Sequence, residues 1–266
     1  MFLQTQSVTY RVKKRGVGKP LVCLHGFGED MSTWDDLEVE GHQLILIDLI
    51  GHGQSSKPYA KRHYRTKTIV RHLKALLSRL GLKQYALLGY SMGGRIALAY
   101  ALRYPDDVEH LILESASYGE RNRKDRRERR QADANLAQNI LRNGADWFEK
   151  HFSEMDIFKS QERLPPEARE KISARRRHNL PHALSNMLLA SGQGVSPCLY
   201  HRLSELLMPV SCLSGEYDTK YTKIGSEFQK RNPKIAHRII ENAGHNTHIE
   251  NRDRFQKVLW LCLLGQ

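Results

Sequence analysis

Apolar and polar positions alternate along the chain in two different patterns. Six apolar runs have the length of buried strands: 20–27, 43–53, 85–90, 110–115, 210–218 and 236–245. Three other stretches repeat apolar residues at helical spacing: 68–81, 92–105 and 252–264. Runs of the first kind separated by stretches of the second predict a parallel sheet whose two faces are covered by helices.

This alternation stops in the middle of the chain. Residues 117–203 contain no convincing strand, and their polar sequence has a helical pattern. A helical insertion between two sheet strands is better interpreted as a lid than as a linker. We therefore predict a core of residues 1–116 and 204–266, with residues 117–203 inserted between core strands as a helical lid.

Length and composition narrow the class of protein. The 266 residues suffice for a large α/β domain with a substantial core. The first residues lack the pattern of a signal peptide, and no apolar run is long enough to span a membrane. The cysteines show no metal or redox spacing, and Cys23 and Cys212 fall in strand-like runs, which favours buried free thiols. We expect a monomeric protein of the reducing cytoplasm with no membrane partner.

The formal net charge is +13, and much of the excess lies in the predicted lid. Residues 121–130 hold seven positive and two negative side chains, and three further arginines occupy 175–177. Such a cluster could bind nucleic acid, form a solvated helix face or bind a small anion. Segment 121–130 has no interleaved aromatic residues on which bases could stack, so we expect no nucleic-acid partner.

The sequence GYSMGG at 89–94 joins a predicted strand to a predicted helix. It matches the pattern G-x-S-x-G, in which glycines permit the tight turn that lifts a serine above the sheet. The alternative is a packing turn with an incidental serine. The position at a helix N-terminus, where developing negative charge is stabilised, favours Ser91 as a nucleophile.

Such a serine needs an acid and a histidine further along the chain. Asp218 ends the strand-like run 210–218, and His245 ends the run 236–245. Asp218 would hold the imidazole in the tautomer that can accept the Ser91 proton. His248 could support the site from behind or simply be exposed to solvent, and we favour the exposed position.

Together these motifs resemble the α/β-hydrolase superfamily over nearly the whole chain. The matching stretches are LHGF, DLIGHGQS, GYSMGG, GEYD and GHNTH. The resemblance implies the α/β-hydrolase fold, a mostly parallel sheet covered by helices on both faces, with a helical lid. It also implies an oxyanion hole formed by the backbone N–H groups of Phe27 and Met92, and neither a metal nor an organic cofactor. This fold supports esterases, C–C hydrolases, lyases and non-catalytic receptors, so the chemistry stays open.

Arg95 follows the serine in the first turn of the predicted helix. A cation at this end of a helix is unfavourable unless an anion lies near it. The position therefore indicates an anion beside the nucleophile, with an outward-pointing surface arginine as the alternative.

With Arg95 included, the chain is similar to the 2-succinyl-6-hydroxy-2,4-cyclohexadiene-1-carboxylate synthases of menaquinone biosynthesis. The similarity is carried by GYSMGGRIAL, GEYDTKY, GHNTHIE and the arginine-rich segment that ends in RRQAD. It implies six substrate-binding residues: Arg95, Arg129, Arg176, Tyr90, Phe152 and Phe158. Either lid arginine could shift by one position, because each has arginine neighbours. Phe152 stands where the family has a lid tryptophan, and Trp147 lies five residues earlier.

The family's substrate is a small tricarboxylate with an enolpyruvyl ether, and planar guanidinium groups suit carboxylates. The resemblance therefore implies a carbon–oxygen lyase that eliminates pyruvate after His245, acting with Ser91, removes a ring proton. A serine carboxylesterase or a C–C bond hydrolase would use the same three side chains. Buried arginines disfavour both, because a pocket for neutral esters would leave their charges unpaired. We expect only Arg129 of segment 121–130 to point inward and its neighbours to be solvated.

Overall fold

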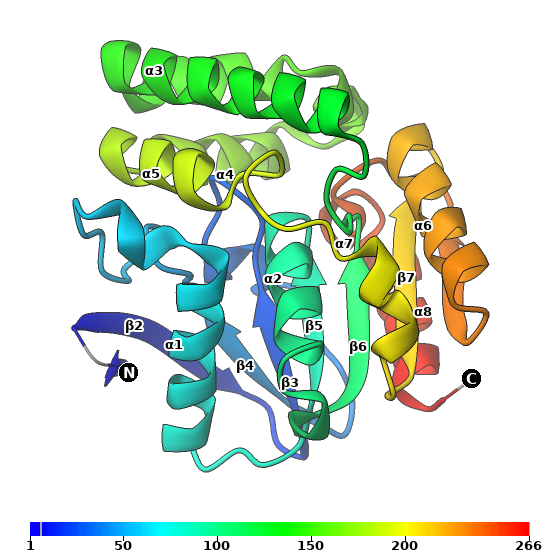
Figure 1. Ribbon diagram of the computed structural model, residues 1–266. Helices are drawn as coiled ribbons and strands as arrows, with labels where there is room; N and C mark the ends of the chain where they lie inside the picture. The colour runs from blue at the N-terminus through cyan, green and yellow to red at the C-terminus, as the bar shows by residue number, and fades with distance from the viewer. Residues whose placement is uncertain (6, 266) are drawn as a thin grey trace.

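The computed structural model describes residues 1–5 and 7–265, which form a central sheet with helices on both faces (Figure 1). The sheet has the strand order β1-β2-β4-β3-β5-β6-β7-β8. Strands β3 to β8 run parallel, and β2 is antiparallel to both of its neighbours. The strands are β1 (Phe2–Thr5), β2 (Val8–Arg15), β3 (Lys19–Leu24), β4 (His42–Ile47), β5 (Tyr85–Tyr90), β6 (Val108–Glu114), β7 (Val210–Gly215) and β8 (Ile235–Ile240).

Eight α-helices and five short 3₁₀ turns connect these strands in the described residues. The helices are α1 (Thr66–Arg79), α2 (Met92–Ala101), α3 (Arg123–Ser153), α4 (Pro166–Arg177), α5 (Pro181–Ser191), α6 (Thr219–Arg231), α7 (Thr247–Glu250) and α8 (Arg252–Leu263). The 3₁₀ turns are η1 (Met31–Trp34), η2 (Lys61–Tyr64), η3 (Pro105–Asp107), η4 (Asp156–Arg163) and η5 (Tyr200–Glu205). No helix within residues 1–5 and 7–265 combines the length and apolar character needed to cross a membrane.

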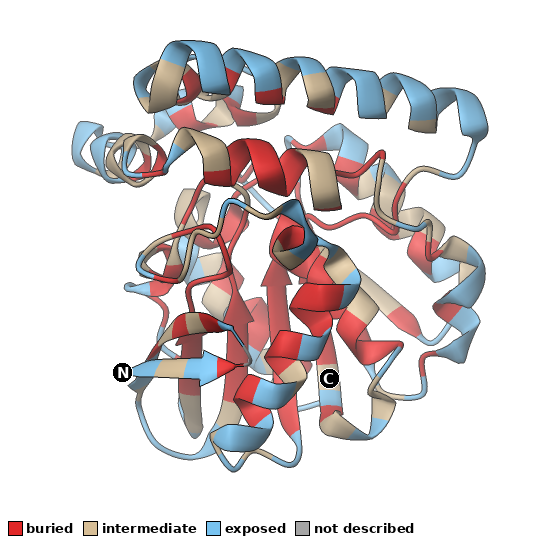
Figure 2. Ribbon diagram, turned by 60° about the vertical axis from the view of Figure 1, so that its left-hand side comes forward, coloured by how far each residue is buried: buried red, intermediate tan, exposed pale blue. Residues whose placement is uncertain are grey.

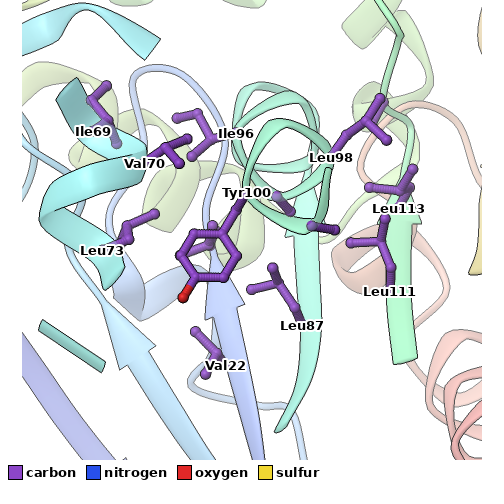
Figure 3. Packing of buried hydrophobic residues seen from close by; sticks show 14 of the residues in the cluster. Val22, Ile69, Val70, Leu73, Leu87, Ile96, Leu98, Tyr100, Leu111 and Leu113 are labelled. Atoms are coloured by element: carbon purple, nitrogen blue, oxygen red, sulfur yellow. The ribbon is translucent and has the colours of Figure 1, made fainter. Parts of the chain in front are cut away.

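Both faces of the sheet are buried, as the continuous apolar strand runs predicted. Along β3, Val22 and Leu24 join the core on one face, whereas Leu21 and Cys23 join the core on the other. Figure 3 shows the first of these cores, where α1 and α2 pack against the sheet. Figure 2 shows the burial of the residues, with the central strands largely red and the outer faces of the helices pale blue. The predicted α/β fold is confirmed, and Cys23 and Cys212 are buried free thiols as expected.

The segment predicted as a lid contains α3, η4, α4 and α5 and no β-strand among its described residues. These helices lie together above the end of the sheet at which the parallel strands finish (Figure 1). Gly144 interrupts α3 with φ 85° and ψ −175°, so the two parts of that helix differ in direction. The segment leaves the sheet after β6 and returns before β7, which are hydrogen-bonded neighbours.

Candidate active site

Ser91 lies in a sharp turn between β5 and α2. Its backbone has φ 50° and ψ −107°, a strained conformation for a residue other than glycine. Its N–H donates to the carbonyl of Glu114 on β6 at 2.8 Å, which holds the turn against the sheet. A Cβ atom at Gly93 would lie 2.3 Å from the carbonyl oxygen of Leu24, so the start of α2 can approach β3 only because this residue is glycine.

Three of the predicted side chains form one hydrogen-bonded chain. His245 Nε2 lies 3.0 Å from Ser91 Oγ, and His245 Nδ1 lies 2.6 Å from Asp218 Oδ2. Asp218 also caps α6, where its Oδ1 accepts from the N–H of Tyr221 at 3.1 Å. Asp218 and His245 are both buried, and each has a hydrogen-bond partner on two sides. The imidazole is therefore oriented to exchange a proton with Ser91.

The first N–H groups of α2, beginning with that of Met92, have no partner one turn earlier in the helix and carry partial positive charge. Phe27 follows the loop after β3, and its side chain lines the same cavity as Ser91 and Met92. The Phe27 ring packs edge-on against Phe148 and Phe152, with centroids 5.6 and 5.7 Å away. The lid thus fixes the residue whose N–H was predicted as the second oxyanion donor.

A cavity of about 1120 Å³ opens between the core and the lid above Ser91. Nine of the predicted residues line it: Phe27, Ser91, Met92, Arg95, Arg129, Phe152, Phe158, Asp218 and His245. Tyr90 and Arg176 do not. The cavity is large enough for a substituted cyclohexene, and the guanidinium groups of Arg95, Arg129 and the exposed Arg163 share it with the serine and histidine.

Arg95 and Arg129 reach this cavity from opposite layers. Arg95 rises from α2 in the core, and one of its terminal nitrogens donates to the Ser191 carbonyl at 3.3 Å. Burial lowers the pKa of Arg95, and the nearby charge of Arg129 adds to this effect. Arg129 is held in place by Asp133, 2.8 Å from its Nε, and by the side chain of Gln193. A carboxylate bound between the two arginines would stabilise both charges.

Arg176 lies deeper in the lid, with 1% of its surface exposed. It donates to Ser153 Oγ at 2.6 Å and to Gln161 Oε1 at 3.4 Å. Its guanidinium carbon lies 4.5 Å from the ring centroid of Phe158 and 5.3 Å from that of Phe152. These two rings line the cavity and stand between it and Arg176. Burial lowers the pKa of Arg176 as well.

Tyr90 packs beside the histidine segment without lining the cavity. It is buried at the end of β5, and its ring centroid lies 5.4 Å from that of His245 and 5.1 Å from that of His248. Tyr90 therefore helps to fix the imidazole from below. Tyr221, which our sequence analysis did not single out, lines the cavity and packs at 4.6 Å against His245.

Our expectation that His248 is exposed was wrong. The side chain is buried, with Nδ1 2.8 Å from Glu114 Oε2 and Nε2 2.8 Å from Thr33 Oγ1. Glu114 also accepts from the His248 N–H at 3.0 Å and from the Thr247 hydroxyl at 2.6 Å. Glu114 therefore holds the turn of Ser91 through its carbonyl and the segment after His245 through its carboxylate. A glutamate that ends an apolar strand run was the sequence signal for this role.

No cluster of three or more His, Cys, Asp and Glu side chains suited to a metal ion occurs in the part of the chain that the structure describes. The site combines a serine–histidine–aspartate chain and helix N–H groups with the guanidinium groups of Arg95 and Arg129. This arrangement can remove a proton from a bound anion or attack a carbonyl, and it can stabilise an oxyanion in either case.

The sheet and the serine turn define the class of protein, that of the α/β-hydrolase fold. A family model described as alpha/beta hydrolase fold matches residues 19–252. A thermophilic esterase from Thermogutta terrifontis superposes with a TM-score of 0.83 at 24% identity, over 97% of this chain and 94% of that chain, which shows a shared fold.

Closer relatives specify the family. A 2-succinyl-6-hydroxy-2,4-cyclohexadiene-1-carboxylate synthase of Salmonella paratyphi C is 32% identical over 87% of this chain and 88% of its own length. A Bacillus subtilis protein that carries the same synthase name is 36% identical over 96% of this chain and 94% of its own. The structure of MenH from S. aureus matches with a TM-score of 0.90 at 32% identity, over 96% of this chain and 98% of that chain. The chain belongs to the 2-succinyl-6-hydroxy-2,4-cyclohexadiene-1-carboxylate synthase family of α/β-hydrolase-fold enzymes.

Proposed function

We propose that this enzyme is a lyase of menaquinone biosynthesis. It eliminates pyruvate from 2-succinyl-5-enolpyruvyl-6-hydroxy-3-cyclohexene-1-carboxylate and yields 2-succinyl-6-hydroxy-2,4-cyclohexadiene-1-carboxylate. The observation that carries this proposal is the presence of Arg95 and Arg129 in the same cavity as Ser91 and His245. These guanidinium groups suit a substrate with several carboxylates. With a neutral ester the partly buried Arg95 would have no acidic partner among the described residues, and Arg129 would have only Asp133. The family relationship supports the same reaction.

The proposed reaction begins with removal of the acidic ring proton next to the succinyl ketone. His245 Nε2 is the base that accepts this proton. Ser91 Oγ lies 3.0 Å from this nitrogen and would stand between the base and the substrate. The electrons of the broken C–H bond move into the ketone, and the N–H groups of Phe27 and Met92 stabilise the enolate oxygen. As the carbonyl reforms, the second ring double bond forms and the C–O bond to the enolpyruvyl group breaks. The leaving enolate takes a proton and becomes pyruvate, so no water is consumed.

Arg95 and Arg129 would bind two of the three carboxylates directly. We propose that Arg176 binds a carboxylate when Phe152 and Phe158 move aside, because these rings separate it from the cavity in this structure. Tyr90 would act by holding His245 and not by touching the substrate.

The test is a side-by-side assay of Ser91→Ala. We expect pyruvate release to fall by about 10³-fold or more, since removal of one member of such a unit removes most of its effect. Ser117→Ala is the matched control, because Ser117 is also buried near the ends of the strands and its hydroxyl has no hydrogen-bond partner. Near-normal turnover by Ser91→Ala would refute the role of the serine.

The same samples separate the lyase from a hydrolase. A carboxylesterase should cleave p-nitrophenyl acetate rapidly with the same three side chains, whereas the proposed lyase should be poor at this reaction. Brisk ester cleavage without pyruvate release from the enolpyruvyl substrate would assign the site to an esterase.

A further inference from the structure

A second cavity, of about 770 Å³, lies between the core and the lid away from Ser91. Its walls come from the beginning of α1, the end of α2, the end of α5 and the segment 195–199 that follows α5. Figure 1 shows α1 and α2 side by side, beneath α5 and the loop that follows it. The proposed reaction does not use this cavity.

The charged lining of this second cavity is entirely cationic in the described residues. Five basic residues line it: Lys61, Arg65, Lys67, Arg103 and Arg202. Only Arg202 has a carboxylate within 4.0 Å, that of Glu205, in the part of the chain that the structure describes. Four exposed cations thus gather around one opening without an acidic partner, and their combined field favours an anion there.

The beginning of α1 adds to this positive field. Arg65 stands at the N-cap position and supplies no side-chain acceptor, and the first turn contains no acidic residue. The N–H groups of that turn carry the partial positive charge of the helix, so Arg65 and Lys67 occupy the end at which cations are destabilising. An anion at this point would accept from the N–H groups of Thr66 and Lys67, because that of Thr68 already donates to the Arg65 carbonyl, and it would offset the surrounding charges.

Apolar side chains form part of the cavity wall, beside the polar Thr66 and Ser196. Val70, Leu102 and Leu199 are buried in its lining, and Leu189 of the lid faces them from above. A ligand that fits this lining has a charged head and a compact apolar body, since a fully hydrated anion would leave the apolar wall without a partner.

Hydrogen bonds fix the seam between lid and core along this cavity. Thr66 Oγ1 lies 3.0 Å from Ser196 Oγ, which in turn donates to the Ser191 carbonyl at 3.0 Å. The same carbonyl accepts from Arg95 at 3.3 Å. The second cavity is therefore a built pocket that shares one wall with the candidate active site.

We propose that the second cavity is a binding site for an amphiphilic anion, with a carboxylate or phosphate head at the beginning of α1 and an apolar body against Leu102 and Leu199. The site is independent of the proposed lyase reaction, and its test measures binding directly. Octyl phosphate, octanoate and the neutral octyl glucoside serve as probes in isothermal titration calorimetry of the full chain. The first two distinguish a phosphate from a carboxylate head, and the third measures the apolar contribution alone.

The variants compare two pairs of charge reversals of equal size. Arg65→Glu/Lys67→Glu alters the cavity, whereas Arg62→Glu/Arg71→Glu changes exposed residues nearby that do not line it. We expect at least one anionic probe to bind the unaltered protein, to bind the first pair at least tenfold more weakly and to bind the control pair within about threefold, with octyl glucoside weaker throughout. Ala190→Trp, which fills the cavity without a change of charge, should also weaken binding.

Three results would overturn the proposal. The first is that neither anionic probe binds. The second is that the two double variants bind the anionic probe equally well, and the third is that octyl glucoside binds as tightly as the anions. Binding in the candidate active site would leave the affinity of Arg65→Glu/Lys67→Glu unchanged and would exclude substrate, so it also counts against the second site.

Discussion

Arg95 is the residue at which the fold and the proposed chemistry meet most directly. An isolated helix disfavours a cation in its first turn, and burial makes the charge at this position still less favourable. Within the chain only the Ser191 carbonyl is its hydrogen-bond partner among the described residues. A guanidinium group in such surroundings indicates that its principal partner is an anion from outside the chain.

We predict that Arg95→Ala raises KM for the enolpyruvyl substrate and lowers kcat/KM at least about thirtyfold, because loss of one partner from a desolvated charge pair costs about 2 kcal/mol or more. Steady-state kinetics of pyruvate release measure this change. Arg71→Ala removes an exposed charge on α1 and should change kcat/KM less than twofold. Unchanged kinetics of Arg95→Ala would show that this side chain does not bind substrate.

His248 shows how a side chain can be hidden from a reading of the sequence alone. Its partners Glu114 and Thr33 lie 134 and 215 residues away along the chain, and its ring stacks on Trp34 with centroids 4.1 Å apart. No local pattern contains these contacts. The same limit applies to Arg176, whose predicted place in the pocket depended on how two lid rings pack.

We predict that His248→Ala lowers the free energy of unfolding by about 2–4 kcal/mol, because it removes a buried stacked ring and leaves Glu114 with one donor fewer. It should also lower kcat, since the segment that carries His245 loosens. Urea unfolding and pyruvate release measure the two effects. The exposed His201→Ala is the control and should change neither. A loss below about 1 kcal/mol would show that the Glu114 network does not depend on this ring.

At the scale of the elements, the parallel strands and the amphipathic helices could be predicted well, whereas the first two strands could not. All six predicted strand runs overlap a strand, and 85–90 coincides with β5. Strands β1 and β2 were not predicted, because neither has a continuous run of buried apolar residues. In β2 the buried residues Val8, Tyr10 and Val12 alternate with exposed or half-buried ones. The three charged residues that end β2 mask this alternation.

The contact of α2 with β3 yields a prediction at this scale. Gly93→Ala would place a Cβ atom against the Leu24 carbonyl, and neither backbone can move without shifting the turn of Ser91. We expect a loss of about 1–3 kcal/mol in the free energy of unfolding and a fall of at least tenfold in kcat. Thermal unfolding and pyruvate release give the readouts. Ser78→Ala in α1 is an exposed helical control, and a fully active Gly93→Ala would contradict the close packing of this turn.

For the whole molecule, the buried His52 and His72 and the half-buried His110 link stability to pH. Burial lowers the pKa of His52 to about 3 and the pKa values of His72 and His110 to about 4, from the ordinary value of 6.5. As the pH falls below 6.5 the unfolded chain therefore binds protons that the folded chain does not. Stability is fully present above this pH and declines toward pH 4.

We predict that His110→Asn reduces this decline. The variant removes one of the three groups, so its free energy of unfolding should fall less steeply between pH 6.5 and pH 4, by at most about 1.4 kcal/mol per pH unit. Urea unfolding at a series of pH values measures the slope for both proteins. Equal slopes would show that His110 is protonated in the folded state across this range.

The serine, histidine and aspartate could be predicted at this scale because the carboxyl ends of parallel strands converge on one edge of the sheet, wherever they stand in the sequence. The second cavity could not, because it depends on how the lid settles on α1 and α2. The excess of positive charge was visible in the sequence. Only the structure shows that Arg95 and Arg129 line the candidate active site, whereas a separate group of basic residues lines the second cavity.

The place where the lid segment, which contains α3, α4 and α5, joins the sheet has a consequence for the evolution of this fold. The 95 residues between Glu114 and Val210 depart from one strand and rejoin its immediate neighbour, so they span a gap of only about 4.8 Å at their root. Insertions, deletions or replacement of the segment at this position leave the register of every strand unchanged. The sheet that positions Ser91 and the lid that covers the cavity can therefore diverge separately during evolution.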